Sequence, residues 1–168
     1  AAHELAAKLR QEGKEAEAGE MEKLALLLDG AAEKQLGLES MEKEKEAKRD
    51  VKEAAAAGHA LADKLREDGC EELGEVVDNV STEAHDALTH AGKIHVEEVE
   101  RALGDAKAAA AKLRAEGKEG EALEMDEMAA KLEAALDAQR EAEDRKQEAE
   151  LAHAAREVAE EAAALATA

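Results

Sequence analysis

The chain has 168 residues, a formal net charge of −20 at pH 7, one cysteine, no proline and no aromatic residue. The negative charge repels phosphate, and the densest cations, between Lys43 and Arg49, alternate with glutamates. We therefore expect no nucleic-acid binding and no attraction to anionic membranes. No apolar run reaches the ~18 residues of a membrane-spanning helix, so we expect no membrane segment.

The amino-acid content favours helices over any other fold class. Leucine, isoleucine and valine total 27 residues, a content that together with the high charge is typical of disordered chains. Alanine contributes 43 residues, however, and both alanine and glutamate are strong helix formers. The sequence predicts a single all-α domain over 1–168, in which helices pack closely on small side chains.

One heptapeptide pattern recurs three times along the chain, as KLRQEGK at 8–14, KLREDGC at 64–70 and KLRAEGK at 112–118. In each copy a glycine follows a basic helical turn, where a left-handed residue ends a helix without steric cost. A glutamate comes two residues later and suits the start of the next helix. These patterns predict turns at Gly13, Gly69 and Gly117 between pairs of helices.

The first and third copies belong to a longer internal repeat with an offset of 104 residues. Between 6–33 and 110–137, 16 of 28 positions are identical, and the similarity extends more weakly over 6–60 and 110–164. Two further turns are expected near Gly37, between two leucines, and near Asn79, followed by one helix from 82 to 116. The fold expected is an antiparallel helical bundle or a short array of helix hairpins, with turns near 13, 37, 69, 79 and 117.

Two resemblances follow from these features. The glycine turns are similar to those of tetratricopeptide repeats, although the spacings of 56 and 48 residues differ from that family's ~34, and its aromatic residue and proline are missing. The whole chain resembles a computationally designed, de novo helical protein in its alanine, glutamate, lysine and leucine content and its tight glycine turns. That resemblance implies a scaffold with an alanine-lined interior, no native enzymatic activity and expression in a reducing cytoplasm.

A candidate cofactor site lies on the helix expected over 82–116. His95 is placed at the centre of its apolar sector, which also holds Leu88, Gly92 and Val99. A lone buried imidazole suits the axial position of a haem or related porphyrin, with Gly92 and Gly58 leaving room for the ring faces. His95 is the one metal ligand expected, and only with such a cofactor. In the alternative interpretation the two glycines let helices cross closely, and His95 is a hydrogen-bonded core residue.

Other reactive side chains receive structural interpretations. Glu150 and His153 have the spacing of a di-metal helix motif, but that chemistry needs a second such motif, so an ordinary surface pair is expected. Cys70 is surrounded by acids that oppose thiolate formation, and Ser81 is expected to cap a helix. With 43 acidic residues, carboxylate spacing carries no information about catalysis. No catalytic residue is predicted.

A partner-binding surface is the remaining possibility. Leu24 and 26–28, together with Met21, Met125 and Met128, form a soft apolar strip at helical spacing. This strip favours either a helical protein-interaction module or helices buried on two sides within an array. The sequence therefore predicts a monomeric designed scaffold first, a haem- or porphyrin-binding helical protein second, and a helical interaction module third.

Overall fold

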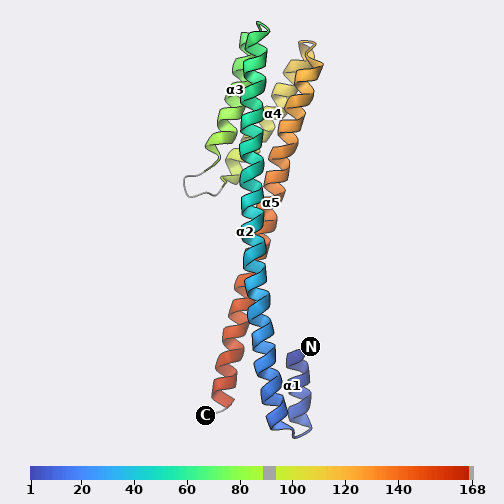
Figure 1. Cartoon of the computed structure of the whole chain (residues 1–168), viewed down its shortest axis with the longest axis vertical. Coiled ribbons are helices and arrows are strands. Elements are labelled where there is room, and N and C mark those ends of the chain that lie inside the picture. Colours follow the sequence, from blue (N-terminus) through green and yellow to red (C-terminus); the bar gives the residue numbers. More distant parts are fainter. Residues whose placement is uncertain (89–93, 167–168) are drawn as a thin grey trace. The chain divides into compact units, whose positions relative to one another are not determined.

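A computed structural model describes residues 1–88 and 94–166 of the chain (Figure 1). The described residues are 91% helical, form five helices and contain no strand, which confirms the all-α prediction. The helices are α1 (Ala2–Gln11), α2 (Glu15–Glu67), α3 (Glu71–Asp86), α4 (Val96–Ala115) and α5 (Glu119–Ala166). None of the described helices combines the length and the hydropathy needed to cross a membrane.

Three short turns reverse the chain at positions of the recurring heptapeptide. Gly13, Gly69 and Gly117 have φ angles of 75°, 81° and 73°, a conformation that glycine adopts without a steric penalty. In the first turn the backbone amide of Gly13 donates to the carbonyl of Arg10 at 3.0 Å. The amide of Lys14 donates to the carbonyl of Leu9 at 2.9 Å, so the last carbonyls of α1 are satisfied.

The turns expected near Gly37 and Asn79 are wrong. Gly37 lies inside α2 and Asn79 lies inside α3. A single glycine costs a helix only about 1 kcal/mol, which good helix formers on both sides can offset. Ser81 does not cap a helix, because its hydroxyl donates to the carbonyl of Val77 one turn earlier, at 2.9 Å.

The single helix expected over 82–116 is also wrong. α3 ends at Asp86, and α4 begins at Val96 after an isolated bridge between Leu88 and Ile94. The amide of His95 donates to the carbonyl of Ala87 at 2.8 Å, which joins the two ends of this connection. The reversal lets α4 lie against α3, so the apolar faces of both helices are covered, as one straight helix could not achieve.

The chain divides into two compact units. Unit 1 comprises Ala1–Ser40 and Glu143–Ala168, and unit 2 comprises Met41–Ala142. Unit 2 contains α3, α4, the second half of α2 and the first half of α5. Unit 1 contains α1, the first part of α2 and the last part of α5.

Unit 2 has a continuous hydrophobic core made largely of alanine. All members of the core cluster lie between Ala47 and Ala138, and its largest fully buried side chains include Leu65, Leu113 and Leu132. Ion pairs join α2 to α5 at Glu53–Lys131 and Lys64–Glu124, 3.1 and 3.0 Å apart. Residue numbers therefore rise along α2 as they fall along α5.

Polar contacts join the helices of unit 1. His3 pairs with Asp29 at 2.8 Å, and Glu33 pairs with Arg156 at 3.1 Å. Where the structure describes unit 1, its buried apolar residues are three alanines, Ala6, Ala18 and Ala25. Among the described residues of unit 1, no leucine, valine or methionine is fully buried.

Candidate functional site

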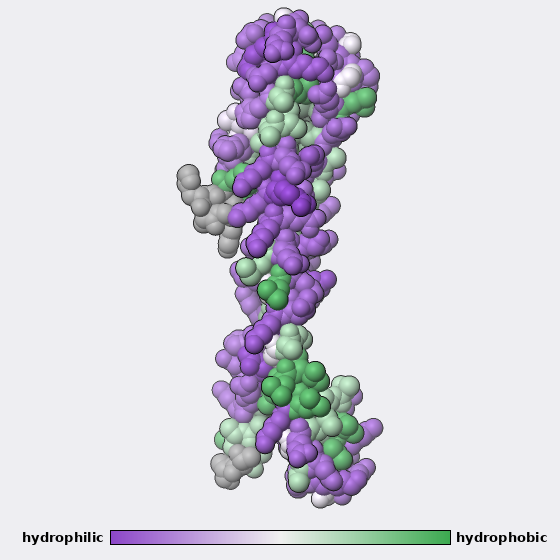
Figure 2. Space-filling model, viewed as in Figure 1, coloured by the Kyte–Doolittle hydropathy of each residue, from purple (hydrophilic) through white to green (hydrophobic). Residues whose placement is uncertain are grey.

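Large apolar side chains gather on the surface of unit 1 (Figure 2). Ten large hydrophobic residues are exposed in the described part of the chain, and only Met41 and Leu123 of these belong to unit 2. The other eight are Leu5, Leu24, Leu27, Leu28, Leu38, Leu151, Val158 and Leu165. Most of the large apolar side chains that are exposed in the described residues therefore belong to unit 1.

Part of this surface is a regular row on α2, here called the exposed α2 stripe. Its members are Leu24, Leu28, Ala31, Gln35 and Leu38, and all five are exposed. Steps of four and three residues place them on one side of the helix, in the pattern by which helices pair in coiled coils. The stripe is interrupted by a single polar side chain, Gln35.

The repeat-related positions of α5 have the opposite environment. In the internal repeat, the residues equivalent to the exposed α2 stripe lie 104 positions later in the chain and form a row on α5, here called the buried α5 stripe. Its members are Met128, Leu132, Ala135, Gln139 and Ala142, and all five are buried in unit 2. Leu28 is 55% exposed, whereas its counterpart Leu132 is 0% exposed. A face that is covered in one hairpin is therefore uncovered in its relative.

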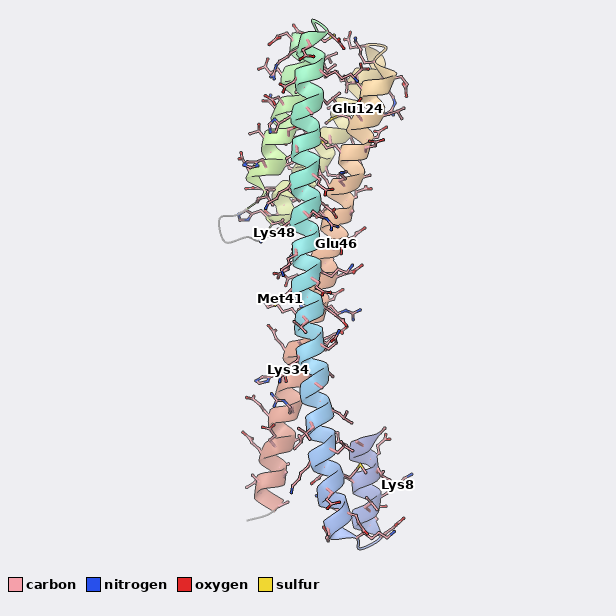
Figure 3. All side chains as sticks on the ribbon, in the orientation of Figure 1. Lys8, Lys34, Met41, Glu46, Lys48 and Glu124 are labelled. Atoms are coloured by element: carbon pink, nitrogen blue, oxygen red, sulfur yellow. The ribbon has the colours of Figure 1, made fainter. Side chains whose placement is uncertain are left out.

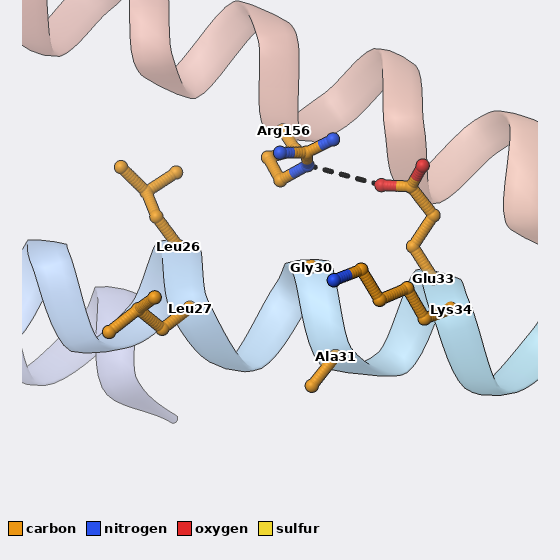
Figure 4. A pocket seen from close by; sticks show the side chains of 7 residues that line it. All are labelled: Leu26, Leu27, Gly30, Ala31, Glu33, Lys34 and Arg156. Carbon is orange, nitrogen blue, oxygen red and sulfur yellow. Dashed lines mark hydrogen bonds and ion pairs between the residues drawn. The ribbon is translucent and has the colours of Figure 1, made fainter.

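A recess of about 320 Å³ lies beside the exposed α2 stripe, lined by residues of α2 and by Arg156 of α5 (Figure 4). The Arg156 Nε atom donates to Glu33 Oε2 at 3.1 Å, and His153 Nδ1 lies 2.9 Å from Glu33 Oε1. These contacts hold α5 against one side of α2. Figure 4 shows Ala31 on the opposite side of α2, so the exposed α2 stripe is not covered by α5.

Comparison with protein-family models, curated proteins and solved structures finds no match to this chain. The site is accordingly interpreted from its own geometry. In that geometry the exposed α2 stripe offers apolar contact area at helical spacing. The recess beside it adds the charged pair of Glu33 and Arg156.

The residues predicted for a cofactor site lie in different environments. His95 is exposed and immediately precedes α4, with φ −83° and ψ 104°, so its predicted place at the centre of a helical apolar sector is wrong. Val99 is buried in the core of unit 2, and Leu88 is half-buried. Gly92 lies outside the described residues. Haem or porphyrin ligation by His95 stays a prediction.

The space above Gly58 is filled by protein. A Cβ atom at this position would lie 2.0 Å from the Ser81 hydroxyl oxygen and 2.9 Å from the Met128 sulfur. These distances are too short for a side chain, so the missing Cβ lets α3 approach α2 closely. Gly58 therefore has the geometry of a close helix crossing, and its face is not open to a planar ring.

The other predicted residues form no cluster suited to catalysis or metal binding. Cys70 is half-buried immediately before α3, in a recess of about 380 Å³ that also contains Glu71, Glu72 and Lys112. His153 pairs with Glu33 and with Glu157. Within 1–88 and 94–166, no three histidine, cysteine, aspartate or glutamate side chains come close enough to share a metal ion.

The structure reveals one carboxyl pair that the sequence did not indicate. Glu83 of α3 and Asp105 of α4 line a recess of about 330 Å³ together with Asn79 and Lys112. The Glu83 Oε2 atom is buried and accepts no hydrogen bond from a donor group. Burial, followed by the hydrogen bond and the charge of Asp105, raises the pKa of Glu83 to about 7, while Arg101 acts in the opposite direction. Nothing distinguished Glu83 among 43 acidic residues in the sequence.

Proposed function

We propose that this protein is a helical interaction module, in which unit 2 is a folded scaffold and unit 1 supplies the docking surface. The observation that carries the proposal is the contrast between the exposed α2 stripe and the buried α5 stripe. The two rows are related by the internal repeat, yet only the row in unit 2 is covered.

The exposed leucines make docking favourable. Transfer of a leucine side chain from water to an apolar contact is worth roughly 1.5–3 kcal/mol. Leu24, Leu28 and Leu38 are 46, 55 and 57% exposed, so a partner that covers them recovers part of this energy from each. Contiguous apolar surface of this kind is typical of interaction sites on soluble proteins.

The spacing of the stripe indicates the shape of the partner. Side chains at steps of four and three residues fit into the spaces between side chains of another helix. An amphipathic helix laid along α2 would meet all five positions of the exposed α2 stripe. The proposed partner surface is therefore helical.

The proposal is tested by the stability of a variant in which the stripe is polar. We expect Leu24→Gln, Leu28→Gln and Leu38→Gln together to change the free energy of unfolding by at most about 0.5 kcal/mol per site. The reason is that these side chains contact solvent in the isolated chain. Urea unfolding of dilute protein, followed by circular dichroism at 222 nm, measures this change.

The matched control places glutamine at members of the buried α5 stripe. Met128→Gln and Leu132→Gln should lower the stability of the chain strongly, because each places an amide group in the core of unit 2. If the stripe variant loses as much stability as this control, the exposed α2 stripe is part of the chain's own core. The proposal of a docking surface would then be wrong.

A further inference from the structure

Unit 1 carries a second uncovered row of apolar side chains, here called the exposed α5 stripe. Its members are Leu151, Ala155, Val158, Ala162 and Leu165, and all five are exposed. They follow the same steps of four and three residues as the exposed α2 stripe. Leu151, Val158 and Leu165 are 72, 67 and 78% exposed, so this row is at least as open to solvent as the first.

The exposed α5 stripe also has a buried counterpart in unit 2. The equivalent residues of the repeat lie 104 positions earlier in the chain and form a row on α2, here called the buried α2 stripe. Its members are Ala47, Val51, Ala54, Gly58 and Leu61, and all five are buried. Both uncovered rows of unit 1 therefore correspond to covered rows of unit 2.

In unit 2 the two buried stripes pack against one another. The Met128 sulfur lies 2.9 Å from the Cβ position of Gly58, which brings the two rows into contact. Ion pairs between Glu53 and Lys131 and between Lys43 and Glu141, each 3.1 Å apart, border the contact. The two residue numbers total 184 in each of these ion pairs and 186 at the Gly58–Met128 contact, and together these totals define the register along this border of α2 and α5.

We propose that the exposed α2 stripe of one copy of this chain docks on the exposed α5 stripe of a second copy, as the buried α5 stripe packs on the buried α2 stripe in unit 2. The inference rests on the proposed function and names its partner. Within one chain every member of both stripes is exposed, so neither row is covered by the other. There α2 and α5 contact each other through other residues, such as Glu33 with Arg156 and Glu39 with Arg145.

Charged residues at the borders of the two stripes agree with this pairing. The register of unit 2 places Lys34 opposite Glu150 of the second copy and Lys23 opposite Glu161, since each pair again totals 184. All four side chains are exposed, and Figure 3 shows Lys34 on the part of α2 that belongs to unit 1. Opposite charges thus border the docked rows on both sides of their centre.

The apolar layers also fit in this register. Leu28 of one copy meets Val158 of the other, and Ala31 meets Ala155, since the residue numbers of these layers total 186 as they do for Gly58 and Met128. A large residue therefore faces a large one, and a small residue faces a small one. In unit 2 the register of Gly58 and Met128, continued along the two helices, places Leu132 level with Ala54 and Ala135 level with Val51. The total apolar volume is therefore similar in the proposed contact and in the observed one.

A charge-reversal experiment tests the pairing. One variant carries Lys23→Glu and Lys34→Glu, and the other carries Glu150→Lys and Glu161→Lys. Each variant alone places like charges across the contact, so we expect association to weaken at least tenfold. An equimolar mixture restores opposite charges in both possible contacts, so we expect it to associate as the unmodified chain does. Sedimentation velocity at 1–200 µM measures the association.

The controls separate the pairing from changes in net charge and in folding. Lys45→Glu with Lys52→Glu changes the net charge by the same amount as Lys23→Glu with Lys34→Glu. These two lysines are exposed positions of unit 2, so this control should leave association unchanged. Val158→Gln removes one apolar side chain from the exposed α5 stripe and should weaken association without any change in charge. Circular dichroism confirms that each variant retains its helices.

Two outcomes would overturn the inference. The first is an unmodified chain that sediments as a monomer throughout the concentration range. The second is a pair of charge variants that associate separately as well as the unmodified chain does. In either case the second copy is not the partner. The docking surface itself is tested separately by the stability of the glutamine variant of the exposed α2 stripe.

Discussion

The two units contain closely related helix hairpins in different surroundings. The hairpin of α4 and α5 shares 16 of 28 positions with the hairpin of α1 and α2 over the aligned segments. In unit 2 the α5 residues of this hairpin pack against α2, whereas the related α2 residues in unit 1 face solvent. Leu132 and Leu28 are the same residue type at the same place in the repeat, yet Leu132 is buried and Leu28 is exposed.

The comparison distinguishes the side of a helix that is suited to burial from the segment that covers that side. The spacing of apolar residues determines which side of a helix is suited to burial. The segment that covers this side is determined by the connections of the chain and by its partners. Unit 2 supplies the cover from the same chain, and unit 1 does not.

The largest expected difference between the units concerns two leucines. Leu132→Ala removes a fully buried side chain and should lower the free energy of unfolding by about 2–5 kcal/mol. Leu28→Ala should change it by less than about 0.5 kcal/mol, because the side chain already contacts water. Urea unfolding of dilute samples measures both. Equal losses would show that the two units do not differ as described.

Two glycines of α2 provide the next comparison. Gly58→Ala inserts a methyl group against Ser81 and Met128, and should destabilise the protein by about 1–3 kcal/mol. Gly37→Ala meets no atom within 4 Å, and should stabilise α2 by about 0.5–1 kcal/mol through its helix propensity. Thermal unfolding should therefore shift in opposite directions for these variants. A shift in the same direction would contradict the close crossing at Gly58.

The carboxyl pair of unit 2 predicts a pH dependence. The pKa of Glu83 is raised to about 7, above its value in the unfolded chain, so folding favours the protonated form. The stability from this group is fully present below about pH 4.5 and is lost as the pH rises through 7. Glu83→Gln should keep that stability at pH 8, with a gain of roughly 1–3 kcal/mol over the unmodified chain.

The charged groups that face Glu83 of α3 belong to α4. Asp105 raises the pKa of Glu83, Arg101 lowers it, and Lys112 lines the same recess. Unfolding measured from pH 4 to 9 should show a smaller slope for Glu83→Gln than for the unmodified chain. Glu72→Gln, an exposed site on the same helix, is the control and should leave the slope unchanged. Equal slopes for all three proteins would contradict the assigned pKa.

The smallest effect is expected at an ion pair that both hairpins contain. Arg10 donates to both carboxylate oxygens of Glu22, at 2.6 and 2.5 Å, and the repeat-related Arg114 pairs with Asp126. Glu22→Gln should cost about 0.2–1 kcal/mol at low salt, because both side chains of the pair are partly open to solvent. The cost should decrease in 1 M sodium chloride. A loss that is independent of salt would indicate packing instead.

Local features of the fold were predictable because they depend on neighbouring residues. The all-α class follows from the abundance of alanine and glutamate, and the apolar strip at Leu24 and 26–28 follows from helical spacing. The sequence did not indicate that α2 continues through Gly37, because a lone glycine is compatible with either a turn or a helix. It also placed His95 inside a helix, because the apolar pattern on both sides of the connection has the same period.

The remaining features depend on contacts between distant segments. Glu83 and Asp105 come together because α4 folds back along α3, and no local pattern marks that pair. The exposed α5 stripe was not singled out in the sequence, although Leu151, Val158 and Leu165 recur every seven residues. The exposed fractions of these side chains show that the face is uncovered, and the buried rows of unit 2 show that such a face is suited to packing.

The central claim is that the rows related by the repeat are covered in unit 2 and uncovered in unit 1. Hydrogen–deuterium exchange, measured by mass spectrometry on dilute monomeric protein, tests it most directly by comparing 24–38 with 128–142. We predict that the amides of 24–38 exchange at least tenfold faster, because no tertiary contact opposes local opening of their exposed face. Equal protection of the two segments would contradict the account.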